Sequence, residues 1–534
     1  AAILSLFGRP YKPWDVYPTW ELEEAWRHLL AAQHHDNHEC EGLCGHVAEA
    51  QFAFARTLLE QSDPVERLWA RVGAEPGEGV HFNRFGWPVV EEDLPGEWSS
   101  APSMGWSAYK CSPKQRQWTR EGDEARFAAD GFEVVINLLS GGVTSLRTAF
   151  GELTDLAPVI LGKFGGEGVP ACAIFGKSSI EGDALTIELG EDGWARLIYR
   201  PLSEAGSLEV TIEAGAYCED KEIDPGYGGA IKVWWRLDLD GAAVSADSPY
   251  AVYQVGAGVK GRRKYPTGDW MTSPQWFESV EGAFTSQSFV NVAGPDGGLL
   301  ISHGGSQGWF RTEQGLETVL LTRDPWDEDV WHHQASTLFR LHPHQGISQA
   351  ECIKRSVGLS DPQHEYSHHF YRQPSGQPEG LPKLPRSFSA VTVHNPHVLA
   401  TAFYREETAF CKRGLEDYAG EGVLHPFVLR LVEADGIGGE VEVTLPGPIA
   451  KAALTNLLGE TLQELEVEQG DSSLLTPEVG ALKPFGIEAA KIRLTMRPYE
   501  IATLYLDIVP GRKVFRDLDA KREIWATVHR TEEE

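Results

Sequence analysis

Near the start of the chain, hydrophobic residues recur at the spacing of one helix face. They fall at Leu22, Ala25, Trp26, Leu29 and Leu30. This period predicts an amphipathic helix from about residue 20 to residue 36, with Thr19 as its N-cap. A second helical pattern covers residues 47–60 and follows a connection that contains Gly42 and Gly45. Because that connection is short, we expect an antiparallel helix pair.

Beyond Gly79 the pattern changes to short runs in which apolar and polar residues alternate, separated by Gly, Pro and Asp about every ten residues. This period of two is typical of β-strands with one buried face. The clearest runs are residues 133–136, 208–212, 231–237, 441–445 and 492–496. No helix-length pattern alternates with them, which favours antiparallel sandwiches over a parallel sheet. The predicted fold class is therefore α+β, mostly β, with an N-terminal helical bundle segment followed by antiparallel β-sandwich domains.

A chain of 534 residues needs several hydrophobic cores. Residues 373–385 hold four prolines and two glycines, a composition that extends a chain without packing it and so indicates a boundary. We predict a helical middle domain at 1–78, which is part of a three-helix bundle, and a small β domain at 79–130. A large β-sandwich should follow at 131–372 and a C-terminal β-sandwich at 386–534.

Composition narrows the classes of function. Hydrophobic residues make up 42% and charged residues 23%, as in ordinary globular proteins. The net charge of −31 repels nucleic-acid phosphates and anionic lipids. No apolar run approaches the length that spans a bilayer. The sequence therefore argues against a nucleic-acid partner and against a membrane protein.

Seven cysteines, an odd number without regular spacing, argue against a disulfide framework. We therefore expect a cytoplasmic protein. Residues 1–8 read like the end of a helix that stops at Gly8, so we also expect upstream sequence to be missing, and any targeting signal there is not visible.

Potential metal ligands are densest just after the first predicted helix. They are His34, His35, Asp36, His38, Glu39, Cys40, Cys44 and His46. The cysteine spacing does not match a zinc finger, although a separate structural zinc site stays an alternative. Adjacent helical residues point about 100° apart, so at most one of His34 and His35 can face a given ion. The other explanation is that both histidines cap the helix C-terminus, where positive charge is stabilising.

The run QHHD at 33–36 resembles a motif of the glycoside hydrolase family 38 α-mannosidases. Further stretches along the chain are similar to the C-terminal half of that family: FNRFGWP (82–88), PSMGW (102–106), GGVTSL (141–146), KYPTGDW (264–270) and RPYEIATL (497–504). The resemblance thus covers nearly the whole chain. It implies the C-terminal portion of a zinc-dependent, retaining α-mannosidase that hydrolyses α-mannosidic bonds.

The resemblance also implies roles for individual residues. In that family the second histidine of the motif binds zinc and the following aspartate binds substrate hydroxyls, which are here His35 and Asp36. Imidazole is a good zinc ligand, and a carboxylate can accept hydrogen bonds from a sugar. Trp270 is a further candidate for substrate binding, although aromatic residues in β domains are more often core. The loop after Asp36 departs from the family's small-residue pattern, which leaves the substrate preference open.

The resemblance implies that the nucleophile, the acid/base carboxyl and the other zinc ligands come from an N-terminal barrel that this sequence lacks. We therefore assign no catalytic residue in this chain, and we expect it to be inactive alone and to bind zinc weakly or not at all. The expected partners are the missing barrel, on the same gene or in a separate chain, and an oligosaccharide or glycan substrate. Homo-oligomerisation stays open.

The rival hypothesis is a non-catalytic β-sandwich protein that binds carbohydrate or acts as a scaffold. The two hypotheses differ over residues 33–36. The enzyme hypothesis needs this strip at a surface that docks against a barrel, so an exposed and partly apolar face around the helix end would favour it.

Overall fold

The computed structural model describes most of the chain, and every structural statement below concerns the described part. It consists of residues 2–7, 19–34, 42–61, 71–72, 78–94, 97–110, 117–129, 131–156, 158–164, 167–170, 177–189, 195–215, 230–249, 251–256, 282–295, 297–305, 308–322, 334–360, 382–405 and 427–511. The chain divides into two compact units. Unit 1 comprises Ala1–Glu91, Ser99–Cys111 and His364–Glu534, and unit 2 comprises Glu92–Trp98 and Ser112–Gln363.

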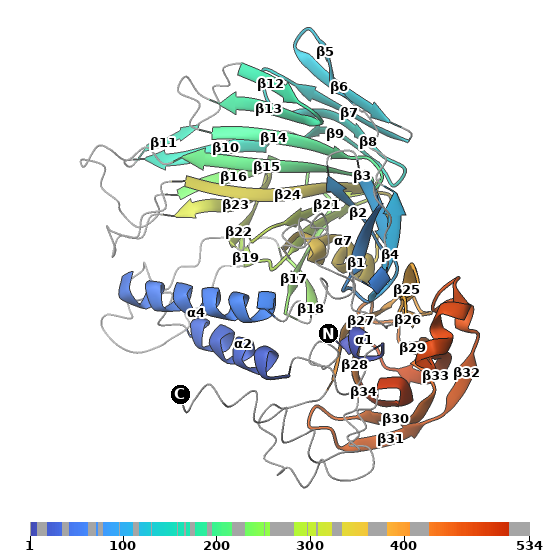
Figure 1. Cartoon of the computed structure of the whole chain (residues 1–534). Helices are drawn as coiled ribbons and strands as arrows, with labels where there is room; N and C mark the ends of the chain where they lie inside the picture. Colours follow the sequence, from blue (N-terminus) through green and yellow to red (C-terminus); the bar gives the residue numbers. More distant parts are fainter. Residues whose placement is uncertain are drawn as a thin grey trace, which may run out of the picture. The chain divides into compact units, whose positions relative to one another are not determined.

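The helices near the start of unit 1 are α1 (Ala2–Ser5), α2 (Thr19–Ala32) and α4 (Gly42–Gln61). Helices α2 and α4 lie side by side (Figure 1). Ala25 is buried in one cluster with Ala55 and Leu58, and the His28 ring packs edge-on against Phe54 with centroids 4.6 Å apart. A later residue of α2 thus contacts an earlier residue of α4, so the two helices run antiparallel, as predicted.

The start of the second helix differs from its prediction. We expected Gly42 and Gly45 in the connection, but α4 begins at Gly42 and includes both glycines. Glycine disfavours a helix interior by only about 1 kcal/mol. Contacts between α4 and α2 can offset such a cost, which makes glycine a weak stop signal at this end of a helix.

Unit 1 contains three antiparallel sheets. The three-stranded sheet has the order β1 (Glu78–Asn83), β4 (Gly105–Lys110), β25 (Ser387–Ser389). The four-stranded sheet has the order β26 (Thr392–Val393), β29 (Gly439–Gly447), β33 (Glu488–Met496), β32 (Val467–Gly470). The five-stranded sheet has the order β27 (Val398–Arg405), β28 (Phe427–Glu433), β34 (Ile501–Ile508), β30 (Ile449–Thr455), β31 (Thr461–Leu465). Short 3₁₀ turns occur at Ser472–Leu474, Val479–Phe485 and Val509–Gly511.

The C-terminal sheets of unit 1 pack through one core. Leu429 and Leu431 of β28 and Leu504 of β34 are fully buried with Val443 of β29 and Ile492 of β33. Leu431 and Ile492 lie between more exposed neighbours along their strands, as expected for two sheets packed face to face. Leu429, Val443 and Leu504 each have one buried neighbour as well. The period-two pattern of the sequence is thus clearest in β33 and in the second half of β28.

In its described residues, unit 2 contains antiparallel sheets of five, six and nine strands and one helix. The five-stranded sheet has the order β5 (Thr119–Glu121), β6 (Glu124–Ala129), β7 (Phe132–Asn137), β8 (Val143–Arg147), β9 (Glu152–Leu156). The six-stranded sheet has the order β11 (Glu167–Pro170), β10 (Pro158–Phe164), β16 (Ala230–Arg236), β23 (Gly315–Thr322), β22 (Gly308–Thr312), β19 (Ala283–Thr285). The nine-stranded sheet has the order β12 (Lys177–Glu181), β13 (Ala184–Leu189), β14 (Ala195–Leu202), β15 (Ser207–Gly215), β24 (Gln334–His344), β21 (Gly297–His303), β20 (Phe289–Gly294), β17 (Ala243–Ser248), β18 (Ala251–Gln254). The helix is α7 (Gln349–Ser360). A two-stranded hairpin of β2 (Val89–Leu94) and β3 (Glu97–Ala101) is divided between the units, since only Glu92–Trp98 belongs to unit 2.

A single hydrophobic core joins the sheets of unit 2. Trp235 of β16 and Phe339 of β24 meet edge to face with ring centroids 5.2 Å apart, and both are fully buried. On the other face of the nine-stranded sheet α7 covers β20, β21 and β24. Two layers of sheet thus enclose an apolar interior, and one helix closes part of an outer face.

The fold class predicted from the sequence is confirmed: the described chain is mostly β, with antiparallel sheets and few helices. Each of the five predicted strand runs falls on an observed strand: β7, β15, β16, β29 and β33. The four-part domain division stays a prediction. No helix in the described residues has the length and apolar character needed to cross a membrane.

Candidate active-site strip at the end of α2

The first half of the predicted strip leaves α2 at its C-terminal end. The Gln33 N–H donates to the Leu29 carbonyl at 3.1 Å, and the His34 N–H donates to the Ala31 carbonyl at 3.3 Å. The second bond spans three residues and tightens the last turn. Ala32 is buried, whereas Gln33 and His34 are exposed. His35 and Asp36, the predicted zinc ligand and substrate-binding residue, lie outside the described residues, so their roles stay predictions.

An apolar stripe on α2 runs toward this strip. Trp26 is 60% exposed and Leu30 is 61% exposed. They are one helical turn apart, and His34 follows Leu30 by the same four-residue step. Helix α4 adds the exposed side chains of Val47, Phe52 and Phe54. The helix pair therefore buries one face on itself and leaves large apolar side chains exposed on another.

The other predicted ligands and the aromatic candidate give no further geometry. His38 and Cys40 lie outside the described residues, and Cys44 and His46 fall in α4, where only their backbone is described. Trp270 also lies outside them. Within the part of the chain that the structure describes, no three His, Cys, Asp or Glu side chains come together as a metal site would require.

Unit 2 contains a buried Asp–Ser–His cluster that the sequence did not indicate. Ser286 Oγ lies 3.0 Å from Asp247 Oδ1, 2.6 Å from the Phe289 carbonyl and 2.8 Å from His303 Nε2. A hydroxyl has one hydrogen, so with two pure acceptors beside it Ser286 receives its third bond from the His303 Nε2–H. Burial lowers the pKa of His303 to about 4, and the charge of Asp247 only partly opposes this.

This cluster has the residue types of a catalytic triad, but a substrate cannot reach its serine. Asp247, Ser286 and His303 are all buried, and Asp247 also accepts hydrogen bonds from the backbone N–H groups of residues 287, 288 and 289. A serine nucleophile must reach its substrate. The cluster therefore fixes the turn that enters β20 and serves structure.

A second buried histidine lies at the end of β24. His344 Nε2 is 2.8 Å from Asn291 Oδ1, and the Gly346 N–H donates to His344 Nδ1 at 3.2 Å. Nε2 must therefore carry the hydrogen, which makes the ring neutral. Burial, followed by repulsion from Arg355, lowers the pKa of His344 to about 4. Its two neutral-ring hydrogen bonds are consistent with a structural role.

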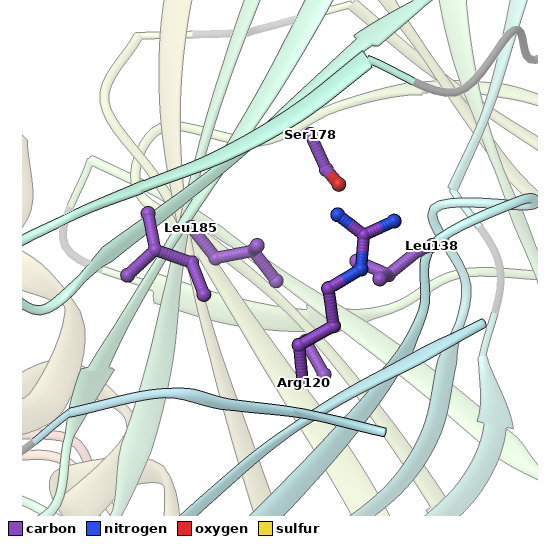
Figure 2. A pocket seen from close by; sticks show the side chains of 6 residues that line it. Arg120, Leu138, Ser178 and Leu185 are labelled. Carbon is purple, nitrogen blue, oxygen red and sulfur yellow. The ribbon is translucent and has the colours of Figure 1, made fainter. Parts of the chain in front are cut away.

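A small cavity of about 120 Å³ lies between the β5–β6–β7 region and the β12–β13 hairpin. Figure 2 shows the Arg120 side chain extending toward Ser178, with Leu138 and Leu185 nearby. The space is too small for the ~300–1,000 Å³ typical of ligand pockets. It is also remote in sequence from the strip at residues 33–36, so we do not assign it to the candidate active site.

Comparison with known proteins identifies part of unit 1. Residues 425–504 match the sequence model described as the glycosyl hydrolases family 38 C-terminal beta sandwich domain. This segment is a family 38 C-terminal β-sandwich domain. It includes β28 through the first half of β34, and it contains the run RPYEIATL, which the sequence analysis compared with that family.

The fold around this family 38 domain has solved counterparts. An alpha-mannosidase from Enterococcus faecalis V583 superposes with a TM-score of 0.59 and 13% sequence identity, covering 94% of this chain and 65% of that one. A protein in the glycosyl hydrolase family 38 from the same organism gives a TM-score of 0.53, also at 13% identity, covering 94% of this chain and 68% of that one. No curated protein matches the sequence.

The chain thus has the fold of these structures but spans only about two thirds of their length. The resemblance to a C-terminal portion of family 38 proteins is confirmed by the domain match and supported by the fold. The domain match lies toward the C-terminal end of the chain, and the helix pair lies near its start.

Proposed function

We propose that this chain is the C-terminal part of a zinc-dependent, retaining α-mannosidase, which contributes His35 and Asp36 to a catalytic barrel carried by another segment or chain. The observation that carries the proposal is the family 38 domain at residues 425–504, within a fold shared with an alpha-mannosidase over 94% of the chain. The substrate would be an oligosaccharide or glycan with α-mannosidic bonds. The odd, irregularly spaced cysteines support a cytoplasmic location.

The zinc part of the proposal depends on the end of α2. The exposed position of His34 supports an accessible strip here, and one His with one Asp falls short of the four ligands that zinc normally takes. The described residues do not complete such a set. A bound zinc would act on the substrate as a Lewis acid. His35 would hold one of its positions, and Asp36, with Trp270 as a further candidate, would bind sugar groups.

The exposed stripe on α2 supports a docking role for the helix pair. Trp26 and Leu30 expose most of their side chains although they are large and apolar, a feature that marks interaction surfaces. A barrel seated on this face would cover both side chains and would bring its own zinc ligands to the strip at residues 33–36. The nucleophile and the acid/base, which a retaining glycosidase needs about 5 Å apart, would come from that barrel, since the spacing of acidic residues in the sequence selects no such pair.

The test is reconstitution with a family 38 catalytic barrel, produced as one fused polypeptide or as a separate chain. We expect hydrolysis of an aryl α-mannoside that is lost on chelation and restored by zinc. His35→Ala should lower kcat/KM at least a hundredfold, because a zinc ligand is removed. His34→Ala is the matched control and should change it less than threefold. Equal activity of the His35→Ala variant and the parent enzyme would contradict the proposal.

A further inference from the structure

Tyr499 has a backbone conformation that few residues of its kind adopt. Its φ is 58°, in the left-handed region, where a side chain costs about 1–2 kcal/mol relative to the right-handed one. Its side chain is nevertheless 61% exposed, so burial of the ring does not compensate for the strain. Strained residues of this kind persist where the surrounding structure imposes them, which happens most often at functional sites.

The structure that imposes this conformation is the buried carboxylate of Glu433 at the end of β28. Its Oε2 accepts the Tyr499 N–H at 2.7 Å and the Gly436 N–H at 2.9 Å. Its Oε1 accepts the N–H groups of Asp435 and Ile437, both at 3.2 Å. Burial alone would raise the pKa of Glu433, but the four backbone donors outweigh burial and hold it below its ordinary value. One ionised carboxylate thus joins the loops at 434–437 and 497–500.

The same loops leave the Tyr499 ring in a fixed place. Gly436 has a φ of 72°, and a Cβ there would lie 2.4 Å from Tyr499 Cζ. The absence of that atom lets the phenol end of the ring rest against the Gly436 backbone. The rest of the ring is presented to solvent. Ile437, which follows Gly436 in the chain, is also 62% exposed.

The two loops that hold Tyr499 also carry polar side chains. Arg497 holds Glu500 through its guanidinium at 3.1 Å and through its backbone N–H at 2.7 Å, while its side chain is largely exposed. His397 Nδ1 lies 2.7 Å from Asp435 Oδ2 in the adjoining loop, with the imidazole partly exposed. Asp435 uses the Nδ1–H of His397, whereas the Arg497 guanidinium has more N–H groups than Glu500 accepts. A donor two residues from an exposed aromatic ring suits a ligand with one apolar face and many hydroxyl groups.

We propose that Tyr499 is a stacking platform for one pyranose ring of a neutral saccharide, at a site on the C-terminal sandwich. The C–H groups on a pyranose face are weakly positive and match the negative face of the phenol ring. The Arg497 guanidinium, two residues away in the same loop and largely exposed, is the donor for hydroxyls at the sugar's edge. A neutral ligand also avoids the repulsion that a net charge of −31 imposes on anions. This site needs no barrel, so it does not depend on the proposed catalytic function.

A protein partner is the main competitor for this surface. Stable protein interfaces bury about 800 Å² per partner, whereas the platform itself offers one aromatic ring and one aliphatic side chain. Leu457 and Leu458 are exposed in the turn between β30 and β31, which lies at the same end of the five-stranded sheet as the 497–500 loop. A protein interface there would use these leucines, whereas stacking of one sugar ring would not.

A substitution at Tyr499 can remove the aromatic ring without disturbing the backbone conformation that holds it. Asparagine tolerates the left-handed conformation better than tyrosine, so Tyr499→Asn should keep or raise the melting temperature of the chain while removing the ring. Binding to soluble α-mannan, measured by affinity electrophoresis, and to methyl α-mannoside, measured by saturation-transfer NMR, should weaken at least tenfold. Tyr499→Trp should keep binding within threefold of the parent.

Two controls share the assays. Tyr404→Asn removes another exposed tyrosine of the same five-stranded sheet, on β27, and Leu458→Ser removes the competing apolar side chain. Both should leave saccharide binding unchanged. Unchanged binding in Tyr499→Asn, or no binding by the parent chain to either saccharide, overturns the proposal. A dimer in sedimentation that Tyr499→Asn and Leu458→Ser both dissociate also overturns it, in favour of a protein interface.

Discussion

At the scale of single residues, several polar side chains hold the structure together from buried positions. His303 and His344 are neutral rings whose hydrogen bonds define which nitrogen carries the hydrogen. Glu433 collects four backbone N–H groups. None of these roles could be predicted from the sequence, because the partners are largely backbone groups and residues from distant strands. Only the packing of the strands brings them within hydrogen-bonding distance.

The buried histidines predict acid sensitivity of unit 2. The pKa of His344 is about 4 in the folded chain and about 6.5 when unfolded. Between these values the unfolded chain binds a proton that the folded chain excludes, so stability is full above pH 6.5 and falls as the pH drops toward 4. The loss is on the order of 3 kcal/mol for one such histidine. His344→Gln should flatten the pH dependence of the urea midpoint, and exposed His34→Gln should not. Parallel profiles for parent and His344→Gln would contradict this account.

Removing the negative charge of Glu433 should lower the free energy of unfolding by an unusually large amount. Glu433→Gln keeps the size of the side chain, but it weakens four charge-assisted hydrogen bonds. It also places the NH₂ group of the amide, which is itself a donor, next to backbone N–H groups. We expect a loss of about 2–3 kcal/mol in the free energy of unfolding, measured with urea. Glu464→Gln is the control: this glutamate and its partner Lys451 are both mostly exposed, so the change should cost less than about 0.5 kcal/mol. Equal effects of the two substitutions would show that the backbone donors do not depend on the Glu433 charge.

At the scale of elements, the hydrophobic pattern was a reliable guide where it ran long enough. Residues 208–212 predict a strand because Leu208, Val210 and Ile212 alternate with polar residues, and they lie inside β15. The sequence pattern does not predict the start of α4, because Gly42 and Gly45 indicate a break there, whereas contacts with α2 stabilise the helix. Pattern predicts which elements exist, and tertiary contacts decide where they begin.

The helix pair predicts opposite outcomes for two leucines. Leu58 is buried between α2 and α4, so Leu58→Ala should lower the free energy of unfolding by about 2–4 kcal/mol. Leu30 is mostly exposed, so Leu30→Ser should leave stability within about 0.5 kcal/mol of the parent. In the reconstituted enzyme, Leu30→Ser should instead raise the dissociation constant for the barrel. A large stability loss with Leu30→Ser would place that side chain in a core and remove the support for docking.

At the scale of the whole molecule, the sequence indicates the family that the chain resembles but not how the chain divides into two compact units. The family resemblance rests on short sequence runs, and the last of these, RPYEIATL at 497–504, lies within the domain match at 425–504. The sequence pattern alone does not indicate that Ser99–Cys111 belongs to the same compact unit as the C-terminal sandwich. That association is made by pairing between distant strands, such as β4 with β25. Long-range pairing leaves no local signature in a single sequence.

The central claim is that this chain holds one ligand of a zinc site that another segment completes. The most direct test is the zinc content of the purified chain and of its reconstituted complex with a family 38 barrel, each measured by mass spectrometry after dialysis. We predict less than about 0.1 zinc per isolated chain and about one per complex, falling severalfold with His35→Ala. One tightly held zinc in the isolated chain, or a zinc content of the complex that does not respond to His35→Ala, would contradict the account.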